Sequence, residues 1–324
     1  ESKMKENQFY ANGRAAVLST KLLGQDKLTR LAECSTVAEA LKILSESGYA
    51  QGMTVSNPND YEKILMAEFD RAIALLKELC YDKNAVGYFL CPYDYHNAKV
   101  LMKRKYMRVS GVDGCFENAL DPVKMQQAFV VDDYSACSVN MAEGCDSVDK
   151  AFADGDRSPR TVDYFLDKAM FADMRRYANK SSINLVRQLY DWQVNTTKLM
   201  LLYRLKKASA DKNSLDRWLV EGGSVSLQLL KNLWDNDGAS MDLPDVYKTF
   251  YQFCTQNNEN LVVAEAEQKK QRNRLLQQSA DLTTIQPVLD YFFKKSDEID
   301  KVRMLIIGIK SGADAESVRN ILKD

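Results

Sequence analysis

Apolar residues recur at intervals of three and four along most of this chain, the spacing of one face of an α-helix. Near the N-terminus, Ala15, Leu18 and Leu22 follow this spacing. The clearest helix is predicted over 60–80, with Asp60 in position to cap its N-terminus. The same pattern predicts further helices over 93–107, 122–131, 160–178, 183–208, 214–220, 224–234, 244–258, 259–280 and 283–310.

Two stretches interrupt this helical pattern. Segment 132–158 is rich in Asp, Gly and Ser, which predicts a loop with a short helix inside it. Such a segment is either a disordered surface loop or a binding loop. A second break is predicted at 235–238, where the sequence reads Asp-Asn-Asp-Gly.

A helix with one pattern of polar and apolar residues recurs four times. Its polar position is Asn12, Asn97, Asn195 and Lys301 in turn, at intervals of 85, 98 and 106 residues. In the second and third copies a leucine follows the asparagine by four positions. On a helix this is a buried stripe with a polar edge. The interval is much longer than the 20–50 residues of a helical solenoid unit, so it indicates larger modules.

The repeat therefore predicts an all-α protein built from three similar helical modules. Their expected bounds are 1–92, 93–189 and 190–324. In the third module, the C-terminal helix repeats the helix that opens each module.

The composition agrees with a helical chain and excludes several classes of function. The 324 residues include 14 glycines and 6 prolines, too few for the turns of an all-β protein. Lys and Arg number 44 against 45 Asp and Glu, a formal charge of −1, so nucleic acid is not expected as a main partner. The single histidine excludes a metal site or catalytic relay that needs two.

Cysteine usage and hydropathy narrow the class further. The chain has seven cysteines and no CxxC pair, so neither a disulfide framework nor a zinc ribbon is expected, and reduced thiols are typical of cytoplasmic proteins. No apolar stretch approaches the 18 or so residues of a membrane span, and the N-terminus has no signal-peptide core. Phosphate-binding, dinucleotide-binding and zinc-protease motifs are absent, so no cofactor is expected.

Two single residues have the chemistry of catalytic groups. His96 lies two positions after Asp94, and side chains two apart on a helix do not face each other. Cys91 has no second histidine to activate it as a nucleophile. We expect a repeat-related role for His96 and a buried structural thiol at Cys91.

Four segments carry patterns of one family. Residues 9–14 contain Tyr-x-Asn-x-Arg, and 93–105 run Tyr-Asp-Tyr-His-Asn into Leu-Met-Lys-Arg-Lys. Residues 219–223 are Leu-Val-Glu-Gly-Gly, and 299–312 run Ile-Asp-Lys-Val-Arg into Gly-Ile-Lys-Ser-Gly. Together they resemble the family of V-type ATPase/ATP synthase C subunits, the bacterial and archaeal relatives of the eukaryotic d subunit. The resemblance covers nearly the whole chain, although Lys301 stands where Asn is usual.

The resemblance implies a funnel-shaped protein whose three helical modules have pseudo-threefold symmetry. It implies a non-catalytic rotor subunit of a V-type rotary ATPase or ATP synthase, peripheral on the cytoplasmic side of the membrane. The expected partners are the central-stalk subunits and the proteolipid ring, between which the subunit transmits torque for proton or sodium transport. No metal, cofactor or nucleotide is implied. The alternatives are a cytosolic helical scaffold outside a rotary ATPase, and an enzyme acting through carboxylates such as Asp94 and Glu298.

The family pattern also selects candidate site residues. They either cap and cross-link helices or contact a partner: Asn12, Arg14, Asp94, Asn97, Lys99, Asn195 and Arg303. A basic cluster follows the central signature and is either a solvated helix face or a contact for an acidic stalk or lipid head groups: Lys99, Lys103, Arg104, Lys105 and Arg108.

Overall fold

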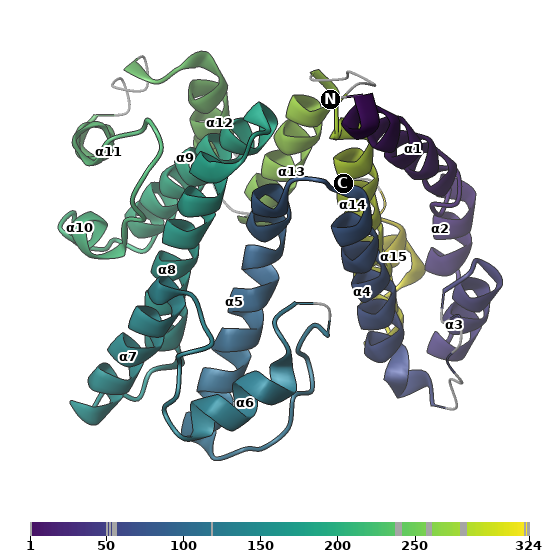
Figure 1. Ribbon diagram of the computed structural model, residues 1–324, viewed down its shortest axis with the longest axis horizontal. Coiled ribbons are helices and arrows are strands. Elements are labelled where there is room, and N and C mark those ends of the chain that lie inside the picture. The colour runs from purple at the N-terminus through teal and green to yellow at the C-terminus, as the bar shows by residue number, and fades with distance from the viewer. Residues whose placement is uncertain are drawn as a thin grey trace. The chain divides into compact units, whose positions relative to one another are not determined.

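The computed structural model describes residues 2–49, 51, 53, 57–117, 119–236, 242–256, 261–278, 284–320 and 322. Over these residues the regular structure is helical with no strand, which confirms the predicted all-α class (Figure 1). No helix within the described ranges combines the length and the apolar character needed to cross a membrane. In chain order the helices are α1 (Ser2–Ser19), α2 (Gln25–Ala32), α3 (Val37–Glu46), the 3-10 turn η1 (Pro58–Asp60), α4 (Tyr61–Leu79), α5 (Lys83–Met107), α6 (Pro122–Val130), α7 (Val139–Ala153), α8 (Pro159–Lys180), α9 (Asn184–Lys207), α10 (Ser214–Trp218), α11 (Leu227–Asp235), α12 (Asp245–Gln256), α13 (Leu261–Gln278), α14 (Gln286–Lys310) and α15 (Ala315–Asn320).

Most helices lie where the apolar spacing predicts them, but their ends follow local hydrogen bonding. The segment predicted over 60–80 is α4. The expected cap is wrong, because the Asp60 carboxylate makes no capping hydrogen bond and instead pairs with Lys63 at 3.0 Å. The predicted break at 235–238 begins where α11 ends, and its last two residues lie outside the described residues.

The start of α5 differs from the prediction, which placed it at 93. The helix begins at Lys83, because Asp82 Oδ1 accepts hydrogen bonds from the backbone N–H groups of Asn84 (2.8 Å) and Ala85 (3.2 Å). Pro92 lies inside the helix, where it has no N–H to donate. The helix continues on both sides of the proline, and its packing against α8 stabilises it.

Segment 132–158 is the other correction. Its expected short helix is the 15-residue α7, which starts where Ser138 Oγ accepts a hydrogen bond from the Met141 N–H at 3.1 Å. One face of α7 is buried against α8. Gly144 allows this close approach, since a Cβ there would lie 3.1 Å from the Cβ of Ala169. The segment was predicted as a loop because it is polar, but a helix that buries only one face can be polar on its other faces.

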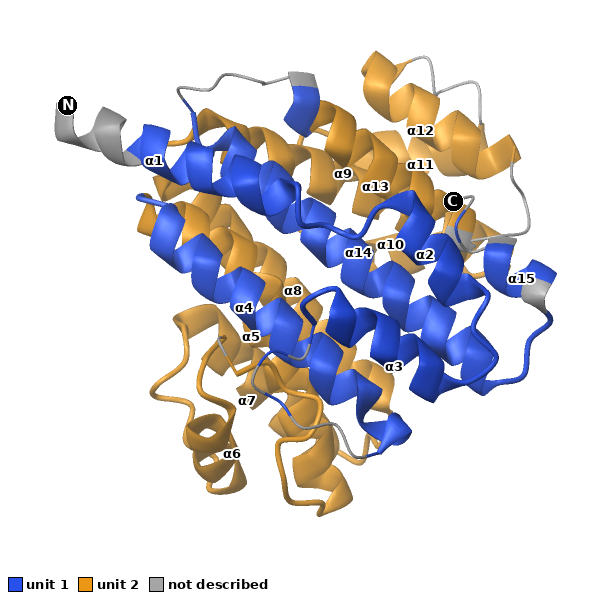
Figure 2. Ribbon diagram, turned by 90° about the vertical axis from the view of Figure 1, so that its right-hand side faces the viewer, with its two compact units in different colours: residues 1–81, 276–324 blue, residues 82–275 orange. Residues whose placement is uncertain are grey.

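The chain divides into two compact units, coloured separately in Figure 2. The first comprises residues 1–81 and 276–324, in which α14 packs against α1 and α4. At its centre the Lys295 ammonium lies 2.8 Å from Glu298 and 2.9 Å from Glu68, with all three side chains largely buried. Glu298 also accepts hydrogen bonds from the Tyr49 hydroxyl and the Leu23 N–H, both at 2.5 Å. One carboxylate thus ties two N-terminal segments to α14.

The second unit comprises residues 82–275. In it α5 and α8 run antiparallel, because contacts that advance along α5 recede along α8: Tyr95 with Asp173, Lys99 with Asp167, and Lys103 with Asp163. Helices α9 and α12 share a separate apolar cluster that includes Leu199 and Phe250, both fully buried. The division into three modules stays a prediction, and its boundaries at 93 and 190 lie inside α5 and α9.

Candidate functional site

Two asparagines of the repeat connect a helix to a loop further along the chain, the one after α5 for Asn97 and the one between α10 and α11 for Asn195. Asn97 on α5 is fully buried, and its Oδ1 accepts the Phe116 N–H at 2.8 Å while its Nδ2 donates to the Phe116 carbonyl at 2.9 Å. Asn195 on α9 is equally buried, with its Oδ1 accepting the Val225 N–H at 2.9 Å and its Nδ2 donating to Ser224 Oγ at 3.0 Å. Each amide oxygen therefore pairs with a loop N–H, which is buried at Val225 and partly buried at Phe116.

The other candidate residues also make contacts within the chain. Asn12 is buried on α1 and donates to the Thr284 carbonyl at 2.9 Å. Arg14 pairs with Glu78, and Arg303 pairs with Glu62 at 3.0 Å and Asp300 at 2.9 Å. Asp94 accepts the Leu120 N–H at 2.6 Å, and Lys99 pairs with Asp167 at 2.7 Å. The candidates lie on α1, α5, α9 and α14, and each has contacts within its own unit.

The contacts of His96 and Cys91 are typical of residues with a structural role. His96 Nε2 lies 2.9 Å from the Gly114 carbonyl oxygen, and its ring contacts Phe116. Burial raises the pKa of the Cys91 thiol well above its ordinary value, and nearby Asp173 raises it further. A thiol with a raised pKa is a poor nucleophile, as expected for a buried structural cysteine.

The basic cluster at the C-terminal end of α5 is mostly engaged. Lys103 pairs with Asp163 at 2.6 Å, and Arg104 donates to the carbonyls of Ser110 (3.2 Å) and Asp113 (3.0 Å). Arg108 follows the helix in a left-handed conformation with φ of 56°. Its side chain is exposed and makes no ion pair or hydrogen bond to the described part of the chain. The Arg108 guanidinium is therefore available to bind an external anion.

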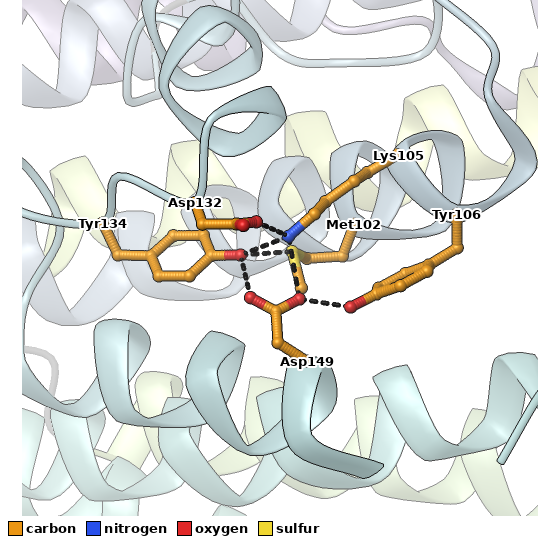
Figure 3. Close-up of polar contacts among 6 residues, drawn as sticks. All are labelled: Met102, Lys105, Tyr106, Asp132, Tyr134 and Asp149. Carbon is orange, nitrogen blue, oxygen red and sulfur yellow. Dashed lines mark hydrogen bonds and ion pairs between the residues drawn. The ribbon is translucent and has the colours of Figure 1, made fainter. Parts of the chain in front are cut away.

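A network of polar contacts surrounds Lys105 (Figure 3). Lys105 lines the same cavity as Arg108. The Lys105 ammonium lies 2.5 Å from Asp132 and 2.8 Å from Asp149, and it donates to the Tyr134 hydroxyl at 2.8 Å. Asp149 in turn accepts hydrogen bonds from Tyr134, at 2.6 Å, and from Tyr106. Burial, followed by the hydrogen bonds to Asp149, raises the pKa of both tyrosines, which therefore remain protonated donors.

A cavity of about 750 Å³ opens beside this network. Four cations and two carboxylates line it, together with the rings of Tyr106 and Phe152: Lys103, Lys105, Arg108, Arg157, Asp132 and Asp149. Arg157 donates to the backbone oxygens of Phe152 and Asp156 but has no ion pair within the described ranges. The excess of cations makes the cavity suited to an anion.

The sequence pattern missed four residues of this site, namely Asp132, Tyr134, Asp149 and Arg157. All four belong to the segment predicted as a loop with a short helix. A signal existed, because Met141, Cys145, Val148 and Phe152 have helical spacing and follow Ser138, a good N-cap. Across the described residues, no group of three or more His, Cys, Asp or Glu is arranged to hold a metal ion.

One protein family matches this chain over nearly its whole length. The model of the ATP synthase (C/AC39) subunit family matches residues 11–321, which is nearly every residue. The chain belongs to this family. The resemblance drawn from the repeated asparagine helices and the glycine pair is thereby confirmed.

Three curated relatives are each named as the C subunit of an A-type ATP synthase. The protein from Methanococcoides burtonii is 20% identical, over 99% of this chain and 96% of its own length. Those from Thermococcus gammatolerans and Pyrococcus furiosus are 23% and 21% identical, each over 97% of this chain and 89% of their own length. The similarity is low in identity but complete in extent, so this chain is related to these ATP synthase subunits from end to end.

Proposed function

We propose that this chain is a non-catalytic coupling subunit in the rotor of a rotary ATP synthase or V-type ATPase. It joins the central stalk to the proteolipid ring at the cytoplasmic side of the membrane. Turning as one body with both, it transmits torque between ATP chemistry and the movement of protons or sodium ions. The observation that carries the proposal is the family match over residues 11–321, which leaves almost none of the chain for another role.

The packing within each unit supports a mechanical role. A coupling element must resist twisting, and long helices tied by buried polar contacts are stiff elements. Asn97 and Asn195 connect helices to their loops, and Lys295 with Glu298 ties α14 to the segments around it. A funnel of three similar modules would place such helices around a stalk, and this arrangement is part of the proposal.

Catalysis by the chain itself has little support from the chemistry of its side chains. Asp94 and Glu298, the carboxylates of the enzyme alternative, are engaged with backbone and with Lys295. Asp94 lies in the second unit and Glu298 in the first, each with its own partners. We therefore assign the ATP chemistry to other subunits and only coupling to this one.

Co-purification tests the proposal. The full chain, carrying an affinity tag, is expressed in its source cells, and their membranes are solubilised in mild detergent. We expect the tag to recover central-stalk subunits and the proteolipid in fixed ratio. Recovery of other partners without either of these would instead favour a helical scaffold outside the rotary complex.

Coupling itself needs a functional assay. Membranes lacking this chain should hydrolyse ATP without building an ion gradient, and the gradient should return when the full chain is restored. ATP-driven ion transport that persists in its absence would contradict the coupling role. Turnover of ATP by the purified chain alone would contradict the non-catalytic assignment.

A further inference from the structure

The ends of α5 and α6 in the second unit form one continuous surface. The 750 Å³ cavity adjoins a second hollow of about 340 Å³, and Lys105 and Arg108 line both. The second hollow is also lined by Val109 and Val130, so the charged and apolar residues are neighbours. We call this region, centred on Arg108, the α5–α6 end surface.

Apolar side chains are exposed on this surface. Met107 is 71% exposed, Val130 64%, Val131 70% and Val109 47%. Single exposed apolar residues are ordinary, but Met107 lines the larger hollow with Arg108, and Val109 and Val130 line the smaller one with it. Val131 follows Val130 directly in the chain. A gathered apolar patch beside cations marks an interaction site.

The cations of the surface are of two kinds. Lys103 and Lys105 are paired with carboxylates. Arg108 and Arg157 are exposed and have no ion pair in the described part of the chain, and both line the larger cavity. The guanidinium groups are therefore the donors available to an external anion, and their geometry suits phosphate oxygens.

We propose that the α5–α6 end surface binds anionic lipid, with Arg108 and Arg157 on the head-group phosphate and with Met107, Val130 and Val131 inserted among the head groups. A free phosphate would satisfy the two arginines but leave the apolar side chains in water. A membrane interface supplies anionic phosphate and apolar surface together, as this arrangement requires. A purely acidic protein surface would satisfy the cations but would leave Met107, Val130 and Val131 exposed to water.

Binding to lipid vesicles tests this proposal on the purified full chain. Vesicles of phosphatidylcholine alone are compared with vesicles that also contain phosphatidylglycerol. The chain should float with the mixed vesicles and not with the neutral ones, and added salt should weaken the association. Inorganic phosphate in solution should not displace it, because phosphate cannot replace the apolar contacts.

Two groups of variants locate the contact. Arg108→Ala with Arg157→Ala should lower partitioning onto mixed vesicles about 25-fold, from about fivefold for each charge. Met107→Ser with Val130→Ser and Val131→Ser should lower it at least about tenfold while leaving the charge unchanged.

The matched control is Arg175→Ala with Arg187→Ala. These arginines are also exposed, lack an ion pair within the described residues, and line a different cavity. Arg175 lies about 24 Å along α8 from Pro159, which lines the proposed site. The control pair removes the same charge and should leave vesicle binding unchanged.

Three outcomes would overturn the proposal. Equal loss in the control pair would mean a general charge effect, and displacement by inorganic phosphate would mean a site for small anions. Unchanged vesicle binding in the Arg108 and Arg157 variant, with loss of stalk subunits from the tagged complex, would mean a contact for an acidic protein. The lipid result does not depend on the rotor assignment, because vesicle binding and co-purification are measured separately.

Discussion

Asn97 on α5 and Asn195 on α9 make matching hydrogen bonds to loop backbone. Both side chains are fully buried, and both accept the N–H of a residue in a later loop, at 2.8 Å from Phe116 and 2.9 Å from Val225. They are 98 residues apart and belong to the helix pattern that repeats along the sequence. A polar residue inside an apolar stripe is thus explained by the backbone that it satisfies.

This role predicts that Asn97→Ala and Asn195→Ala are destabilising. Asn195→Ala removes the acceptor of a buried N–H and Asn97→Ala that of a partly buried one, and an unsatisfied buried group costs about 1–3 kcal/mol. The free energy of unfolding in urea should fall by that amount in each variant. Asn179→Ala, at an exposed position of α8, is the control and should change it by no more than about 0.5 kcal/mol. Losses as small as the control's would refute the role assigned to the buried pair.

Gly223 should tolerate no side chain. Its φ is +69°, and a Cβ there would lie 2.4 Å from Oδ1 of Asn195. Gly155 has a φ of +101°, and a methyl group added there would meet no atom within 4 Å, so Gly155→Ala reports backbone strain alone, about 1–2 kcal/mol. Gly223→Ala should cost more than this in thermal unfolding, since Asn195 must also move. Equal losses in the two variants would mean that the contact with Asn195 is unimportant.

Asp82 should make stability fall in acid. Burial raises the pKa of its carboxyl, but hydrogen bonds from Ser182, Ala85 and Ser181 outweigh burial and hold it below the ordinary value. A lowered folded-state pKa contributes stability above the unfolded value of about 3.9, and this stability is lost as pH falls through the folded pKa. Asp82→Asn should flatten the decline in unfolding free energy below about pH 4.

The comparison variant for Asp82 is Ser182→Ala. It keeps the carboxylate but removes the Ser182 Oγ hydrogen bond at 2.8 Å, which lets the folded-state pKa rise toward the unfolded value. The acid decline should therefore be smaller, and should end at higher pH, than in the unmodified chain. An identical pH profile in all three proteins would show that Asp82 contributes nothing to acid sensitivity.

The Lys295 cluster should be intolerant of losing one charge. Lys295→Met leaves the buried carboxylates of Glu68 and Glu298 without their cation, which should cost about 3–5 kcal/mol of unfolding free energy. Adding Glu298→Gln should recover part of this loss, because one uncompensated charge is then gone. A double variant less stable than Lys295→Met would show that Glu298 stabilises mainly through Tyr49 and Leu23, not through Lys295.

Local pattern was sufficient for most helices and insufficient for two boundaries. Apolar spacing found α4, α8 and α9 because a helix that buries one face repeats every 3.6 residues whatever it packs against. It failed at α5, which was predicted to start at 93 but begins at Lys83 and continues past Pro92 in contact with α8. It failed at α7, where the exposed side carries Asp, Glu and Ser and masks a continuous buried face.

The sequence by itself determined the all-α class, the family and the positions of the repeated asparagines, because each depends on residue order within a helix. Only the tertiary structure decided what those residues contact, and which charges remain available. Lys105 and Arg108 belong to one basic run, yet Lys105 meets Asp132 and Asp149 from other segments while Arg108 meets neither. Ion pairs depend on which helices pack together, and the periodicity of one helix does not predict which segments pack against it.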